Sequence, residues 1–276
     1  MNSKNCIISE KNNVVYITYP NLEKLGFIKH ASSTRIGGVS EIEYLSTMNL
    51  GYHTDDCADN VRKNFEIFAS AIGMDINDMV SSRQRHNENI KTASRADCGM
   101  GITKDADYDD VDALVTNEKY VALTVFGADC VPILFADPKN RAIGAAHCGW
   151  RGTYKNLAYL TAKKMNENYG SKFEDIFVSV APCIHGCCYE VDEKLFNDFK
   201  NKFSYIDQKN AMRIENGAFY LDLPEINRQI LISAGVKEEN ILVSDLCTAC
   251  NHTELFSHRK SNGKRGIMAS VIEITD

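Results

Sequence analysis

The sequence predicts a mixed α/β (α+β) fold in which mixed β-sheets are flanked by helices. Short apolar runs of strand length outnumber the amphipathic helical segments, and many of these runs follow one another without a helix between them. The chain has only 5 prolines and contains no Pro- or Ser-rich linker, repeat or low-complexity segment. We therefore expect one domain that spans residues 1–276.

The individual elements follow from local pattern and turn residues. The expected strands are apolar or alternating runs at residues 14–19, 27–34, 112–116, 121–126, 131–137, 141–150, 176–183, 241–246 and 266–274. Residues 60–74 place Val61, Phe65, Phe68 and Ile72 at helical spacing. A second helix is expected from Thr153 as N-cap to a stop at Gly170, and a third over 223–235.

Composition excludes several classes of function. The net charge is −6, with 37 acidic and 31 basic residues and no basic run, so no nucleic-acid partner is expected. No stretch approaches the roughly 18 apolar residues of a membrane span, and residues 1–13 contain no apolar signal core. We expect a cytoplasmic protein, a monomer or small homo-oligomer, without membrane contact. Standard phosphate-binding glycine motifs are absent.

Three residues with metal-binding side chains lie at the ends of these strands. Cys130 joins two apolar runs, His147 ends the run IGAAH, and His86 lies in RQRHNENI. Antiparallel strands around the turn at Asp137-Pro138 would bring Cys130 and His147 together. Three such ligands with one open position are typical of a catalytic zinc site.

The same residues allow other interpretations. An isolated histidine or cysteine in an apolar run is commonly a core residue. Cys130 could instead be a nucleophile with His147 as its base. A rival, closed metal site is available from Cys183, the pair Cys187-Cys188, and Cys247 and Cys250, with His252 nearby. Spacing alone does not separate these alternatives.

An ordered series of motifs resembles the YfiH/YlmD family, also described as polyphenol-oxidase or laccase-like. The motifs span nearly the whole chain, and the matching segments are STRIGGVS (33–40), NLG (49–51), QRH (84–86), DALVT (112–116), ADCVPILFADP (128–138), AHCGWRGT (146–153), PCIHGCCYEV (182–191) and LCTAC…LFSHRK (246–260). Arg85 departs from the family's usual residue at its position, which could alter substrate preference.

The resemblance implies a YfiH-like fold and one Zn²⁺ held by His86, Cys130 and His147. It also implies purine nucleosides and phosphate as partners, with phosphorolysis of inosine, adenosine or methylthioadenosine and deamination of adenosine. An older view of the family as copper-dependent phenol oxidases makes copper the alternative metal. Bacterial members are also associated with peptidoglycan editing, which would fit a cysteine-dependent hydrolase.

Further residues are assigned roles on these expectations. Phosphate needs a cation, for which the forked guanidinium of Arg35 is the first choice. Asn49 and Gln84 are expected to bind the sugar or base. Asp129 is expected to orient a metal ligand. The thiols of the Cys183/Cys187/Cys188 and Cys247/Cys250 segments are interpreted as buried and structural.

Overall fold

The first layer of strands is a six-stranded mixed sheet. The computed structural model describes residues 1–276, and this sheet has the order β1–β2–β3–β15–β7–β4. Its strands are β1 (Ile7–Lys11), β2 (Val14–Thr18), β3 (Ile28–Ser33), β4 (Met79–Ser81), β7 (Ala122–Gly127) and β15 (Met268–Ile274). Only β4 runs parallel to its neighbour β7. The C-terminal strand β15 therefore lies inside the sheet, and all its residues are buried.

A second six-stranded mixed sheet contains the predicted metal ligand His147, and one of its strands begins directly after Cys130. Its order is β14–β10–β8–β9–β6–β5. The strands are β5 (Ile90–Thr92), β6 (Ala113–Thr116), β8 (Val131–Asp137), β9 (Ala142–Cys148), β10 (Phe177–Val180) and β14 (Ile241–Val243). Strands β8 and β9 form the predicted antiparallel pair, and Pro132 lies opposite His147.

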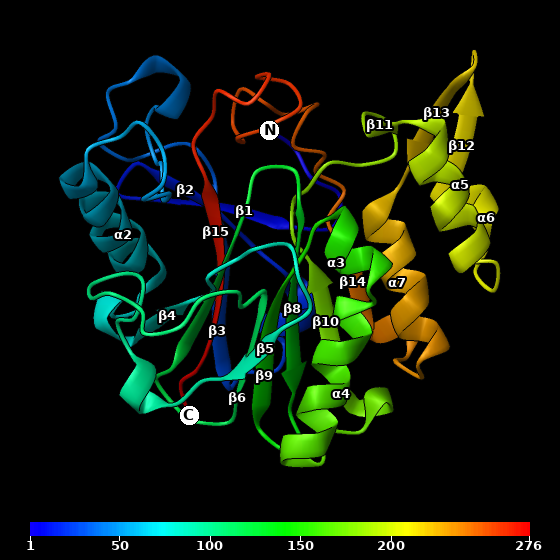
Figure 1. Cartoon of the computed structure of the whole chain (residues 1–276). Helices are drawn as coiled ribbons and strands as arrows, with labels where there is room; N and C mark the ends of the chain where they lie inside the picture. The colour runs from blue at the N-terminus through cyan, green and yellow to red at the C-terminus, as the bar shows by residue number, and fades with distance from the viewer.

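The two sheets pack against each other between layers of helices (Figure 1). One core combines apolar side chains of both sheets, including Val125 and Ile272 from the first and Leu134 from the second. Helix α2 (Ala58–Ile72) covers the outer face of the first sheet, whereas α4 (Leu157–Tyr169) and α7 (Leu223–Ser233) cover the second. Because both faces of β8 and β9 are covered, their sequences are continuous apolar runs.

A small third sheet is an element that the sequence pattern did not predict. It consists of β11 (Glu190–Val191), β13 (Ala218–Leu221) and β12 (Met212–Glu215), in that order. Helices α5 (Glu193–Lys202) and α6 (Gln208–Ala211) precede β12, and Phe196 of α5 packs on Phe219 with ring centroids 5.1 Å apart. The remaining short helix, α1 (Pro20–Glu23), follows β2.

The predicted helix from Thr153 to Tyr169 is wrong at its start. Two helices occupy this segment, α3 (Trp150–Tyr154) and α4, and Asn156 between them has φ 62°. Thr153 lies inside α3, where its hydroxyl donates to the carbonyl of Cys148 at 3.1 Å. Asparagine tolerates the left-handed conformation that breaks the helix. The predicted stop at Gly170 is confirmed, with φ 75°.

The other two predicted helices are confirmed as α2 and α7 within a few residues, and every predicted strand corresponds to a strand of the two large sheets. The class is therefore mixed α/β, with adjacent antiparallel strands rather than regular strand–helix alternation. Among the helices, none combines the length and apolar character needed to cross a lipid bilayer.

Candidate metal centre

The three predicted ligands come together at one end of the second sheet. Cys130 directly precedes β8, His147 is the penultimate residue of β9, and His86 lies on the loop after β4. Their ligand atoms all lie within 4.8 Å of one another, and the two imidazole centroids are also 4.8 Å apart. His147 is buried, whereas His86 is exposed, so the site has a closed side and an accessible side.

The loop that carries His86 is attached to the neighbouring strand β7. The amide of Gln84 donates to the Phe126 carbonyl at 3.0 Å and accepts from the Phe126 N–H at 2.7 Å. This pair of bonds attaches the loop to β7. His86 itself has φ 61°, in the left-handed region that a non-glycine residue adopts only when its surroundings hold it there.

Asp112 contacts both candidate histidine ligands and is a candidate site residue that the sequence analysis missed. Its carboxylate lies 2.9 Å from Nδ1 of His147 and accepts the backbone N–H groups of Arg85, His86 and Asn87 at 2.9, 3.0 and 3.0 Å. An N–H at Nδ1 leaves Nε2 of His147 free to bind a metal. Asp112 opens the DALVT motif, but its position beside His147 depends on the pairing of β6 with β9.

Asp129 does not have the predicted contact with a metal ligand's side chain. Its carboxylate accepts from the Thr248 hydroxyl and from the Arg259 N–H, each at 2.6 Å. Asp129 also has φ 95°, directly before Cys130. The residue thus fixes the backbone that leads into Cys130, and the carboxylate that orients a ligand's ring is Asp112.

Gly149 keeps the space between two of the ligands open. A Cβ atom at this position would lie 3.0 Å from Sγ of Cys130 and 3.0 Å from Nδ1 of His86. Real Cβ contacts are rarely so short, and the φ of −59° would not itself exclude a side chain. Together with two nitrogen donors and one sulfur donor, this preserved space fits a single metal ion with an open position.

The titration of the two histidines differs because their surroundings differ. Burial lowers the pKa of His147, but the neighbouring Cys130 and the Asp112 carboxylate outweigh it and raise that pKa to about 9. Burial and the neighbouring His147 lower the pKa of His86. Metal ligands bind in their deprotonated forms, so a metal ion must displace the proton from His147.

A cavity of about 770 Å³ adjoins the loop that carries His86. Its lining residues come from six parts of the chain and are mostly polar or charged: Leu50–His53, Ala58, Asp59, Arg62, Ser81–Arg85, Gly101–Ala106, Asp109, Phe126, Arg265 and Ile267. Its volume is within the range of small-molecule sites. Gln84, predicted to bind substrate, lines this cavity, although its amide also forms the bonds to Phe126.

Arg35 and Asn49 do not line this cavity, contrary to the arrangement predicted for substrate residues. The guanidinium of Arg35 donates to the carbonyls of Ser46, His252 and Glu43 at 2.9, 3.0 and 3.3 Å. Asn49 is fully buried, and its side-chain oxygen accepts from the N–H groups of Gly51 and Ile267. Both residues instead connect backbone segments.

Arg265 is a cation that the sequence analysis missed. It lines the cavity, and its buried Nε has no hydrogen-bond partner. Burial lowers the pKa of Arg265, whereas the nearby Cys130 and Asp129 raise it. Arg265 therefore connects the cavity with the metal centre. Arg85, which precedes His86 in the chain and also lines the cavity, is already paired with Asp109 at 2.9 Å. No local motif marks Arg265 in the sequence.

The five thiols of the Cys183/Cys187/Cys188 and Cys247/Cys250 segments divide into two groups. Cys187, Cys188, Cys247 and Cys250 form a second cluster whose sulfurs all lie within 4.8 Å of one another. Cys183 is not part of it and packs in the core behind the second sheet. The interpretation of all five as buried is confirmed for Cys183 and Cys247 and wrong for the other three, since Cys187 and Cys250 are exposed and Cys188 is half-buried.

Comparison with known proteins finds relatives over most of the chain. Residues 29–275 match the family model described as multi-copper polyphenol oxidoreductase laccase. Purine nucleoside phosphorylase YlmD of Bacillus subtilis is 35% identical over 241 residues, which cover 87% of this chain and 86% of that protein. Adenosine deaminase RL5, from an unknown prokaryotic organism, is 31% identical over 245 residues, covering 87% and 93% of the two chains.

The fold agrees with a solved structure over nearly its full length. The crystal structure of the Bacillus licheniformis hypothetical protein YfiH superposes with a TM-score of 0.89 at 31% identity, and the match covers 97% of this chain and 99% of that chain.

Proposed function

The chain belongs to the YfiH/YlmD family, the family of the laccase-like model, and from this we propose that it is a zinc-dependent purine nucleoside phosphorylase with adenosine deaminase activity. The relatives named for these two reactions are 35% and 31% identical to it. The observation that carries the proposal is a three-ligand metal centre next to a cavity that contains an unpaired arginine.

Zinc is the metal that the donor set favours. His86, Cys130 and His147 offer two imidazole nitrogens and one thiolate, a combination of ligands that zinc accepts in catalytic sites. When bound, zinc supplies Lewis acidity and makes water available as a nucleophile near neutral pH. The protein's contribution is to fix the ligands, through Asp112 and the Gln84 contact with β7, before any substrate arrives.

Arg265 is our candidate for phosphate binding, in place of Arg35. In phosphorolysis a phosphate oxygen bonds to C1′ of the ribose while the bond from C1′ to the purine nitrogen breaks, and the purine leaves with the electron pair and takes up a proton. The negatively charged nucleophile must be held beside the sugar. A guanidinium can donate two parallel hydrogen bonds to phosphate, and Arg265 presents an unused buried N–H at the cavity.

Deamination uses the same cavity with water as the second substrate. Water adds to C6 of the adenine ring, ammonia leaves, and inosine results. Both reactions therefore bring an oxygen nucleophile to a purine nucleoside, and they differ in which atom is attacked. The polar lining formed by Ser82, Arg83 and Gln84 supplies donors and acceptors for the base or sugar.

The direct test is product analysis on purified protein. With inosine and phosphate we expect hypoxanthine and ribose 1-phosphate, and with adenosine and water we expect inosine and ammonia. His86→Ala is the control, because it removes a ligand from the exposed side of the site. Product formation that does not exceed the His86→Ala level with inosine and phosphate would contradict phosphorolysis.

A copper-dependent phenol oxidase is the second candidate, favoured by the description of the matching family model. Mixed nitrogen and sulfur ligands also bind copper. However, the chain has only 7 histidines, and only one of its two candidate metal clusters contains any. Removing metal with a chelator and restoring zinc or copper separately distinguishes the two candidates: we expect zinc to restore nucleoside turnover and copper to give no turnover of phenols.

A cysteine-dependent hydrolase, the remaining alternative, predicts that Cys130 reacts covalently with substrate. Its test is intact-mass analysis during turnover. We expect no adduct on Cys130, since that sulfur is a metal ligand in the proposed enzyme.

A further inference from the structure

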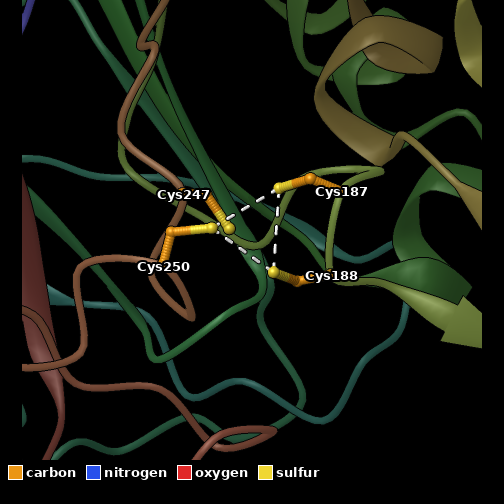
Figure 2. Close-up of side chains that lie close together, drawn as sticks. All are labelled: Cys187, Cys188, Cys247 and Cys250. Atoms are coloured by element: carbon orange, nitrogen blue, oxygen red, sulfur yellow. Dashed lines mark hydrogen bonds between the residues drawn. The ribbon is translucent and has the colours of Figure 1, made fainter.

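Four cysteine sulfurs converge at the surface from two loops that are far apart in the sequence. Cys187 and Cys188 lie on the loop between β10 and β11, and Cys247 and Cys250 lie on the loop after β14 (Figure 2). The separations are 3.7 Å from Cys187 to Cys188, 3.7 Å from Cys187 to Cys250 and 3.4 Å from Cys188 to Cys250. All four sulfurs lie within 4.8 Å of one another.

These separations suit a single ion at the centre of the cluster. In a tetrahedral zinc site with Zn–S distances of about 2.3 Å, neighbouring sulfurs are about 3.8 Å apart. The observed distances are much longer than the roughly 2.05 Å of a disulfide, and all four cysteines are free. A polynuclear iron–sulfur cluster would place its cysteine sulfurs further apart than a single ion does.

The backbone brings the two loops together independently of the thiols. Cys183 and Cys247 form a parallel bridge, and the Thr248 N–H donates to the Cys183 carbonyl at 2.9 Å. Cys247 and Cys250 have the C-x2-C spacing of zinc sites, and the Asn251 N–H closes their turn on the Cys247 carbonyl at 3.0 Å. Four facing thiols are thus a consequence of the fold.

We propose that Cys187, Cys188, Cys247 and Cys250 bind one zinc ion in a closed structural site, separate from the centre formed by His86, Cys130 and His147. Four protein thiolates fill the tetrahedron and leave no position for substrate, which is typical of structural zinc. A zinc tetrathiolate carries a net charge of −2. Arg259 lies nearby and donates to the backbone carbonyls of Cys188 and Glu190 at 3.4 and 2.9 Å, where its positive charge offsets part of this.

The structural ion would fix the loops that support the other metal centre. Thr248, next to Cys247, donates its hydroxyl to the Asp129 carboxylate at 2.6 Å. Ile184, next to Cys183 on the other loop, donates its N–H to the Asp129 carbonyl at 2.9 Å. Asp129 leads with φ 95° into Cys130. Joining the two loops therefore stabilises the backbone conformation that positions a ligand of the other centre.

The test is metal counting on the full chain, and it is independent of any enzymatic activity. Protein produced with zinc and dialysed into zinc-free buffer is analysed by elemental and native mass spectrometry. We expect two zinc ions in the wild type, one in Cys188→Ser/Cys250→Ser, and one in His86→Ala/His147→Ala. Cys57→Ser, an exposed thiol outside both clusters, is the matched control and should retain two.

A second measurement keeps the proposal testable if the double serine variant fails to fold. Zinc X-ray absorption on His86→Ala/His147→Ala should show sulfur ligands only, at about 2.3 Å. The proposal is overturned if this variant binds no zinc, if its zinc has nitrogen or oxygen ligands, or if intact mass shows a disulfide among the four cysteines instead of a second ion. If wild-type protein holds two zinc ions but shows no nucleoside phosphorolysis, the result contradicts the proposed function and leaves the structural zinc site supported.

Discussion

The carboxylate of Asp112 lies 2.9 Å from Nδ1 of His147 and also accepts the backbone N–H of His86 at 3.0 Å. One side chain therefore orients the ring of one metal ligand and the backbone of another. A carboxylate in such a position fixes the tautomer of a ligating histidine and makes its other ring nitrogen a stronger ligand for the metal. Both histidines depend on Asp112, although they lie 61 residues apart in the chain.

Asp112→Asn should weaken metal binding. Each carboxylate oxygen of Asp112 accepts two of the four donors. The amide replaces one of these oxygens with an N–H₂ group, so two donors lose their acceptor. We expect a loss of about 10- to 100-fold in zinc affinity or activity, the usual effect of removing such a partner. Competition with a chromogenic chelator measures it. Asp110→Asn is the matched control, because Asp110 contacts the amides of Asn87 and Asn89 and no ligand. Equal affinities in the two variants would contradict this role.

Gly149→Ala should hinder metal binding by a steric effect alone. The added methyl group would lie 3.0 Å from both Cys130 Sγ and His86 Nδ1. Overpacking of this kind costs roughly 1–3 kcal/mol, or about 5- to 150-fold in affinity. We expect weaker zinc binding with little change in the stability of the metal-free protein, because the φ of −59° suits alanine. Circular dichroism and metal titration on the same preparation separate these effects.

Arg265→Gln should raise KM for phosphate far more than KM for the nucleoside. A hydrogen bond from a charged group contributes about 1.5–3 kcal/mol, which corresponds to roughly 10- to 150-fold. Arg265→Lys keeps the charge without the planar fork, so its KM should be intermediate. Steady-state phosphorolysis at varied phosphate checks this. An unchanged phosphate KM in the glutamine variant would assign the anion to another cation of the cavity.

Arg35→Ala should destabilise the fold and leave phosphate binding unchanged. Three backbone carbonyls each lose a hydrogen bond from Arg35, and the stacking of the guanidinium 4.8 Å above Phe256 is also lost. We expect a loss of roughly 2 kcal/mol in the free energy of unfolding, a decrease of several degrees in Tm for a chain of this size. A raised phosphate KM at a temperature where the variant is folded would restore the original prediction for Arg35.

Glu273→Gln should change the pH dependence of stability. Burial, aided by Asp78 and Asp75 and opposed by Lys29 and Arg95, raises the pKa of Glu273 from 4.5 to about 7. The folded state therefore prefers the protonated form. The contribution of Glu273 to the free energy of unfolding of the wild type is therefore fully present below about pH 4.5 and is lost as the pH rises through about 7.

Glutamine stays neutral throughout this range. The free energy of unfolding of the variant should therefore rise relative to that of the wild type between about pH 4.5 and 7. Below and above this range the difference between the two proteins should not change with pH. Urea unfolding of both proteins at pH 5 and pH 8 measures that difference. An identical difference at the two pH values would show that Glu273 is ionised in the folded protein under both conditions.

The sequence by itself was enough for the class of fold and for nine of the twelve strands of the two large sheets, whereas β1, β4 and β5 were not predicted. Continuous apolar runs such as 131–137 and 141–148 indicate strands covered on both faces, and the turn at Asp137-Pro138 indicates the antiparallel pair that joins Cys130 to His147. It did not predict the third sheet, whose strands are short and partly exposed. Nor did it locate the break at Asn156, because helical periodicity continues through it.

Tertiary structure decided which polar side chains serve the site. Arg35 lies in one of the family motifs and Arg265 lies in none. Yet the guanidinium of Arg35 donates to backbone carbonyls, whereas Arg265 has a free N–H at the cavity. Asp129 and Asp112 are both acidic residues beside strands, and only the pairing of β6 with β9 places Asp112 against His147. Residue type determines which chemistry is available, and local pattern determines strands. Register and loop packing determine which groups meet, because those contacts join residues that are distant in the chain.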